Sequence, residues 1–315
     1  MVFRRAVMAL LGCLGIAYKT TKPSPAPPES TEPPPPPPPP HQSSSSSSSK
    51  PSSSLSSSPS DGDDVGVVGE SRIRLRDGRF LAYTERGVPK NKSKFRVIIV
   101  HGFGSSKEMS FLAPQEIMDE LGVHLVLFDR AGYGESDPNP KRSLESEATD
   151  IQELADKLEL GSKLAGVAMV VPTINYNWPS LPGDLTKDDF RKSLTQWALR
   201  AARYTPGLNK LQQQGVFDSL RRDFIAAFGK WDFDPLELVN PFPKNESSVH
   251  IWQGYEDKVV PFPLQRYVSS KLPWIRYHEV PDGGHLLVYD SDVCEAILRS
   301  LLLGEDPPLY RPKLS

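Results

Sequence analysis

The sequence predicts an α/β fold in which a mostly parallel central sheet carries helices on both faces. Short β-branched runs alternate with amphipathic helical patterns over residues 71–312, and this alternation is typical of a parallel sheet covered on both sides. The net charge of −2 and the apolar fraction of 38% fit a soluble globular region. They argue against nucleic acid as the main partner.

The elements follow in a regular order. Residues 72–75 and 80–83 flank Asp77-Gly78, which is a hairpin signal. Apolar runs of the kind buried in parallel sheets predict strands at 96–100, 124–129, 166–171, 249–252 and 275–280. Helices are predicted at 114–121, 147–158 and 292–302, with a short helix between the last two strands.

Residues 172–245 interrupt this rhythm and predict a helical cap. Two apolar stripes at helical spacing run through it, namely Phe190, Leu194, Trp197, Ala201 and Tyr204, and then Phe217, Leu220, Phe224 and Phe228. Each stripe could line a substrate pocket. The interpretation that we favour is the buried face of a helix.

The N-terminal region differs in composition from the rest. Residues 1–18 join Arg4-Arg5 to an apolar stretch that is shorter than a bilayer-spanning helix. They predict a signal peptide, with Gly15 and Ala17 offering a cleavage site, or a short membrane anchor, and therefore a secretory-pathway or membrane-anchored location. Residues 19–70 are rich in proline and serine. They predict a disordered linker.

Three short motifs each follow a predicted strand. They are HGFG at 101–104, GYED at 254–257 and GGH at 283–285, with DRAGYGESD at 129–137 after the first. In this order the motifs resemble the α/β-hydrolase superfamily, of the AB hydrolase-1 type. More closely, the chain is similar to a plant group of membrane-tethered hydrolase-like proteins.

The resemblance implies roles for three residues of a serine-hydrolase site. Asp257 would be the acid that orients the base, His285 the general base, and the backbone N–H of Phe103 one oxyanion donor. It implies a small ester-like ligand and no cofactor. No Cys or His stands at chelating spacing, so no metal is expected.

The nucleophile is the part that the sequence lacks. No G-x-S-x-G occurs in the chain, and residues 159–163 run directly into Leu164 and a run that resembles the family's sixth strand. The fifth strand, the elbow serine and the following helix are therefore expected to be missing, as in a spliced or truncated form. A second alignment lays residues 166–170 over the elbow and places Ala168 at the nucleophile position. Neither alignment supplies an attacking atom.

Other serines are weak substitutes. Ser136 lies in a motif that the family uses structurally, whereas Ser105 and Ser106 would cap the start of a helix. Without the fifth strand, residues 166–171 should pair directly with 96–100 or leave backbone groups unpaired.

Three functions follow from the sequence. The first is a catalytically inactive hydrolase derived from an esterase- or lipase-like enzyme. The second is a ligand-binding or regulatory module that keeps the fold without the chemistry. The third is an active serine hydrolase whose printed sequence lacks a real segment.

Overall fold

The computed structural model describes residues 15–20, 71–161, 164–204, 214–244 and 247–307. The strands are β1 (Gly15–Thr20), β2 (Ser71–Arg74), β3 (Phe80–Gly87), β4 (Phe95–Val100), β5 (Val123–Phe128), β6 (Gly166–Val170), β7 (Val249–Gly254) and β8 (Ile275–Val280). The helices are α2 (Gln115–Leu121), α3 (Leu144–Lys157), α4 (Gly183–Thr186), α5 (Phe190–Tyr204), α6 (Gln214–Phe228), α7 (Phe262–Lys271) and α8 (Ser291–Leu303). Short 3₁₀ turns occur at Lys90–Lys92, Pro235–Glu237 and Leu287–Tyr289.

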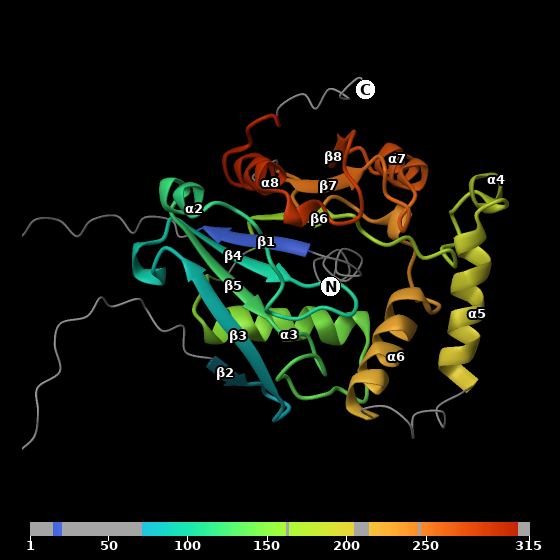
Figure 1. The fold of residues 1–315 in the computed structure, drawn as a ribbon, viewed down its shortest axis with the longest axis horizontal. Helices are drawn as coiled ribbons and strands as arrows, with labels where there is room; N and C mark the ends of the chain where they lie inside the picture. The colour runs from blue at the N-terminus through green and yellow to red at the C-terminus, as the bar shows by residue number, and fades with distance from the viewer. Residues whose placement is uncertain (1–14, 21–70, 162–163, 205–213, 245–246, 308–315) are drawn as a thin grey trace, which may run out of the picture. The chain divides into compact units, whose positions relative to one another are not determined.

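The eight strands form one mixed sheet in the order β2-β3-β5-β4-β1-β6-β7-β8 (Figure 1). β4 and β5 are parallel to each other, as are β6, β7 and β8. The hairpin predicted around Asp77-Gly78 is formed by β2 and β3, with Gly78 at a φ of 95° that favours glycine. The predicted strands and helices of the sheet region are confirmed to within a few residues.

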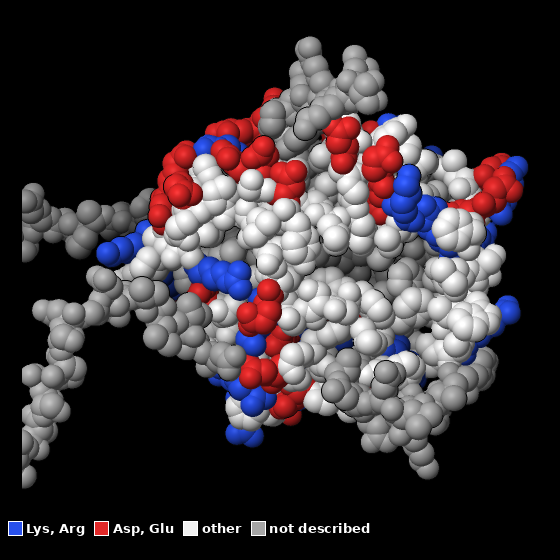
Figure 2. All heavy atoms as spheres, in the orientation of Figure 1, with Lys and Arg blue, Asp and Glu red and all other residues white. Residues whose placement is uncertain are grey.

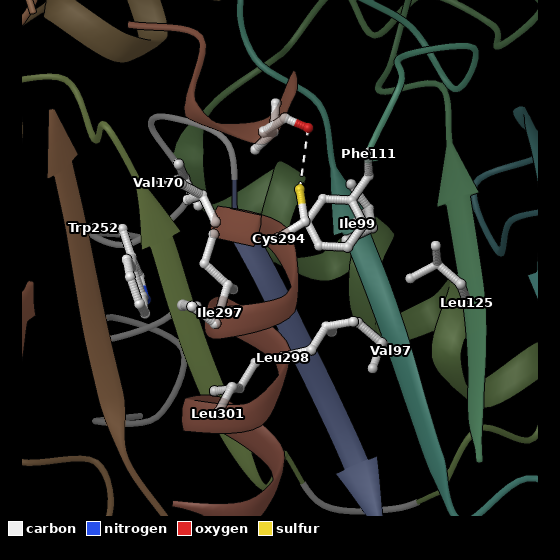
Figure 3. Close-up of a cluster of buried hydrophobic side chains, with 14 of the residues drawn as sticks. Val97, Ile99, Phe111, Leu125, Val170, Trp252, Cys294, Ile297, Leu298 and Leu301 are labelled. Carbon is white, nitrogen blue, oxygen red and sulfur yellow. Dashed lines mark hydrogen bonds between the residues drawn. The ribbon is translucent and has the colours of Figure 1, made fainter. Parts of the chain in front are cut away.

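Helices cover both faces of the sheet. On one face, α2 and α8 pack against apolar side chains of β4, β5, β6 and β7. Figure 3 shows this core, in which Ile297, Leu298 and Leu301 of α8 lie over Val97 and Trp252. On the other face, α3 packs against β3, β4 and β5, and α7 packs against β6, β7 and β8. The predicted α/β architecture is therefore confirmed.

The strand between β4 and β6 comes from the N-terminal segment. β1 runs antiparallel to both neighbours, pairing six residues with β4 and four with β6. In Figure 3 it passes beneath α8 in the direction opposite to the flanking strands. Residues 158–165 contain neither a strand nor a helix among those described. The prediction that residues 166–171 pair directly with 96–100 is wrong, because β1 separates them and satisfies both edges.

β1 also bears on the predicted leader. The proposed cleavage site at Gly15 and Ala17 lies within the strand, so cleavage there would remove half of its pairing. Residues 1–14 and 21–70, and with them most of the predicted leader and linker, lie outside the described residues. Among the described helices, none is long and apolar enough to cross a bilayer. Secretory routing and membrane attachment stay predictions.

The cap contains α4, α5 and α6, and its two stripes behave differently. In α6, Phe217 is 45% exposed, whereas Leu220, Phe224 and Phe228 are half-buried, and the rings of Phe224 and Phe228 lie 4.7 Å apart. In α5, Phe190 and Trp197 are 68% and 67% exposed. The prediction that both stripes are buried faces is therefore wrong for α5. Helical spacing identifies an apolar face but not the direction in which it points.

Candidate active site

The three motifs of the predicted site meet at one edge of the sheet. β4 and β6 both run antiparallel to β1, so they share one direction, and β5, β7 and β8 run the same way. The carboxyl ends of these five strands therefore lie at the same edge. The HGFG turn follows β4, Asp257 follows β7 and His285 follows β8. Ligands of parallel α/β sheets bind at this kind of edge.

Asp257 is a buried carboxylate that accepts several hydrogen bonds. Its Oδ1 accepts from the backbone N–H groups of Val259 at 2.7 Å and Val260 at 2.9 Å. Its Oδ2 accepts from Gln253 Nε2 at 3.2 Å. Burial acts to raise the pKa of Asp257, but the hydrogen bonds to His285 and to the two backbone groups hold it below its usual value. The carboxylate is therefore charged and fixed.

His285 meets Asp257 at the same edge. Its Nδ1 lies 3.0 Å from Asp257 Oδ2, and its side chain is 36% exposed. Because the carboxylate only accepts, Nδ1 carries the proton and Nε2 keeps its lone pair in the neutral ring. Two backbone bonds hold the loops together, from Tyr255 N to Val280 O at 3.0 Å and from Glu256 N to Gly283 O at 2.9 Å. The pair has the tautomer and the orientation of a general base with its orienting acid.

The HGFG turn lies after β4, on the other side of β1. Phe103 is 54% exposed, and its ring meets Phe224 of α6 edge-on at 6.0 Å. His101 is buried and accepts from Arg130 N at 3.0 Å through Nε2, so its Nδ1 carries the proton that reaches Gly102 O. Burial, together with the Arg130 charge, lowers the pKa of His101 to about 3. This histidine is a neutral structural group that shapes the turn.

A buried ionic cluster ties the turn to the cap. Asp223 of α6 accepts from Arg130 Nη2 at 2.5 Å and from the Tyr133 hydroxyl at 2.6 Å. Arg142 lies 3.3 Å from Asp223 and 2.8 Å from Glu147. Burial acts to raise the pKa of Asp223, but the Arg130 and Arg142 charges lower it. Arg130 Nη2 also donates to Gly102 O at 3.2 Å, so one guanidinium joins the turn to α6.

The sequence did not single out Arg130 and Asp223. Arg130 lies inside the DRAGYGESD motif, which was quoted only for the resemblance. Asp223 is an acidic residue between Leu220 and Phe224 in an apolar stripe. That position was the one sign in the sequence that its carboxylate could be buried and paired. The two residues are 93 positions apart, so their pairing could not be read from local spacing.

The serines weighed as substitute nucleophiles have structural roles. Ser136 is buried, donates to Asp129 O at 2.7 Å and accepts from Ala82 N at 2.9 Å. Ser106 Oγ accepts from Glu108 N at 3.2 Å in a turn. The prediction that Ser105 and Ser106 start a helix is wrong, since the next described helix begins at Gln115. A local turn satisfies the Ser106 hydroxyl instead.

The alternative alignment of the elbow also fails. Ala168 lies in the middle of β6 and is fully buried, with its neighbours paired to β7. An elbow residue must instead sit on a sharp turn between a strand and a helix, where its side chain is exposed. Among the described residues, no group of three His, Cys, Asp or Glu side chains is placed to hold a metal ion.

Comparison with known proteins decides the family. The model of the Alpha/beta hydrolase family matches residues 97–298. The chain belongs to this family. The match spans both halves of the sheet and the cap, so it includes all three motifs at the carboxyl edge.

Solved structures of hydrolase-family proteins support the fold at low identity. An esterase from Exiguobacterium antarcticum is 17% identical, with a TM-score of 0.51, and the match covers 70% of this chain and 93% of the esterase. A bromoperoxidase from Bacillus anthracis is 15% identical, with a TM-score of 0.52, covering 75% of this chain and 100% of that one. No curated protein matches the sequence. At these identities the likeness establishes the fold alone.

Proposed function

We propose that the chain is a catalytically inactive member of the hydrolase family, derived from a serine esterase-like ancestor. The observation that carries the proposal is the strand between β4 and β6. In an active serine hydrolase, this position leads at the carboxyl edge into the strand-to-helix turn that holds the nucleophile. Here β1 runs in the reverse direction, so Gly15, its first residue, lies at that edge beside Val100 and Met169.

The loss of a nucleophile is a large effect. In a well-studied serine protease, its removal lowers turnover by about 10⁶-fold. The residue after the nucleophile also supplies an oxyanion donor, so this chain lacks that donor as well. Asp257 and His285 would then form an acid–base pair with no hydroxyl to deprotonate. We expect ester hydrolysis near the uncatalysed rate.

Labelling of the full-length protein tests the proposal directly. The purified chain should not gain the mass of a fluorophosphonate probe, while an active esterase treated in parallel should be labelled stoichiometrically. Hydrolysis of p-nitrophenyl acetate should be the same for His285→Ala and for the unchanged protein. Stoichiometric labelling, or a hundredfold fall in rate in His285→Ala, would overturn the inactive assignment.

Two side chains need their own controls. Ser136→Ala tests the buried hydroxyl, and Cys13→Ala tests the thiol that precedes Gly15 by two residues in the sequence. Labelling by fluorophosphonate that disappears in either variant, together with a loss of ester hydrolysis, would identify a substitute nucleophile and end the proposal. Sequencing transcripts across codons 155–175 separates this chain from an active form. A strand with G-x-S-x-G inserted there would assign activity to the longer product.

A ligand-binding role is a second candidate, favoured by the intact hydrogen bond between Asp257 and His285 and by the exposure of the imidazole. The Asp257–His285 hydrogen bond is intact, and the imidazole is partly exposed at the carboxyl edge. A small ester-like ligand could accept or donate a hydrogen bond there without being cleaved. Saturable binding of such an ester without turnover, weakened in His285→Ala, would support this role. A heat of binding that is unchanged in His285→Ala would contradict it.

A further inference from the structure

The exposed face of α5 is the feature of the molecule that the hydrolase site does not use. Phe190, Leu194 and Trp197 are 68%, 59% and 67% exposed. They recur at the spacing of one helical face. Large apolar side chains that gather on a surface mark an interaction site more often than single ones do.

The helix is held so that this face points outward. Leu199, on the opposite side, is 7% exposed. Arg221 of α6 donates to Ala202 O at 3.1 Å, and Lys192 donates to Thr186 at 3.0 Å. These contacts lie away from the stripe. The apolar stripe is therefore presented by a docked helix, and none of the described residues covers it.

The charge on α5 is of one sign. The helix contains Arg191, Lys192, Arg200 and Arg203 and no acidic residue. Arg200 is exposed at the side of the stripe, whereas Arg203, four residues after the buried Leu199, lies on the opposite side of the helix. The nearest preceding carboxylate, Asp189, is engaged by Arg191 at 3.0 Å and by the Tyr176 hydroxyl at 2.7 Å. Figure 2 shows acidic and basic side chains together near α4, with a largely uncharged surface over α5 below them.

We propose that α5 docks on the surface of an anionic lipid bilayer. A helix with aromatic and leucine side chains on one face and basic side chains beside them lies in the plane of a membrane interface. Phe190, Leu194 and Trp197 would enter the boundary between headgroups and acyl chains. Arg200 would meet a lipid phosphate, which its positive charge attracts. A second copy of this chain carries a net charge of only −2, so it offers α5 far less negative charge than an anionic lipid surface does.

The start of α5 lies against the loop that carries Asp257, so the apolar stripe is connected to the Asp257–His285 site. Arg191 Nε donates to Lys258 O at 2.9 Å, which holds the start of α5 against the loop that carries Asp257. Val259 of that loop is 57% exposed. Docking through α5 would therefore bring the Asp257 loop close to the bilayer. This inference does not depend on whether the site hydrolyses anything.

The fluorescence emission of Trp197 can test the proposal. The chain has five tryptophans, of which Trp178 and Trp252 are 8% and 0% exposed, whereas Trp197 is 67% exposed. Vesicles of phosphatidylcholine with about 30% phosphatidylserine should shift the emission of the full-length protein to shorter wavelength, because the indole enters the interface. Brominated lipids should quench that emission. Trp197→Phe should sediment with the same vesicles but lose the spectral change.

Matched variants separate α5 from the N-terminal segment. Leu194→Ser should weaken sedimentation with the anionic vesicles about tenfold, whereas Leu303→Ser, at a side chain 41% exposed on α8, should not. Arg200→Gln should weaken it by about fivefold at low salt, whereas Arg203→Gln, on the opposite side of the helix, should not. The proposal would be overturned if Leu194→Ser and Arg200→Gln sedimented with anionic vesicles as the unchanged protein does. It would also be overturned if vesicles left the Trp197 emission unchanged. A blue shift that follows protein concentration without lipid would overturn it too, since that would place a second copy on α5.

Discussion

The two halves of the carboxyl edge make an instructive comparison. On the side of β7 and β8, Asp257 and His285 are placed as a serine hydrolase requires, 3.0 Å apart and with the acid fully charged. Between β4 and β6 lies β1, which runs antiparallel to both neighbours. The acid–base pair is built by short loops that hydrogen-bond to each other. Its geometry therefore does not depend on which strand lies between β4 and β6.

The largest expected effect comes from removing β1. Deleting Val2–Thr21 leaves the facing edges of β4 and β6 without partners, and each buried unpaired backbone group costs about 1–3 kcal/mol. The total would exceed the stability of most domains, which is about 5–15 kcal/mol. We expect the protein to lose its cooperative urea transition and its soluble yield.

The matched control keeps the strand. Deleting Val2–Cys13 removes most of the apolar leader but leaves Gly15–Thr20, so its urea midpoint should stay near that of the full chain. If both deletions unfold at the same midpoint, β1 is dispensable. The two halves of the sheet would then be able to pair directly.

The second effect concerns the link between the HGFG turn and the cap. Asp223→Asn removes the carboxylate that faces Arg130 and Arg142, leaving Arg130 without its main counter-charge and Arg142 with Glu147 alone. Breaking a buried pair in this way costs about 3–5 kcal/mol. The free energy of unfolding in urea should fall by that amount.

The control for this variant lies on the same helix. Asp218, 39% exposed, lies 3.7 Å from Arg221, and exposed pairs contribute at most about 1 kcal/mol. Asp218→Asn should therefore change the free energy of unfolding far less than Asp223→Asn. Equal losses in the two variants would mean that the Arg130 cluster does not hold the cap to the turn.

The fold was predictable from the sequence where the signal is local. A few adjacent residues are enough to predict the strand that ends at Val100 and the hairpin at Asp77-Gly78. The same holds for the motifs around Asp257 and His285. Hydrophobic periodicity and turn chemistry are sufficient for such elements.

Long-range contacts were not predictable in the same way. Residues 15–20 have the composition of a leader, and only their pairing with strands that begin at Phe95 and Gly166 makes them a strand. The Arg130–Asp223 pair joins residues far apart in the chain, and so does the bond from Arg191 to Lys258 at the start of α5. These outcomes depend on which surfaces remain uncovered after the sheet is assembled.

The smallest effect is a pH dependence in the half of the sheet that keeps the acid–base pair. His250 is fully buried in β7, with Nε2 2.7 Å from Ser248 Oγ and Nδ1 2.8 Å from His278 Nε2. Burial, then the neighbouring His278, then the Arg276 charge lower the pKa of His250 to about 3. Burial and Arg276 likewise lower the pKa of His278 to about 4, against the opposing charge of Asp306.

These pKa values fix the sign of the dependence. Unfolded histidine takes up a proton near pH 6.5, whereas folded His250 stays neutral, so the unfolded state binds more protons and stability falls as pH drops below about 6.5. Each such histidine should lower the free energy of unfolding by about 1.4 kcal/mol for each pH unit below 6.5, down to its pKa in the folded protein. Between pH 7 and pH 5, the free energy of unfolding of His250→Gln should therefore fall by about 2 kcal/mol less than that of the unchanged protein. Urea unfolding across this range measures the difference, and between pH 7 and pH 8 the two proteins should have equal slopes. An acid slope that is the same with and without His250 would show that this half of the sheet takes up protons without unfolding.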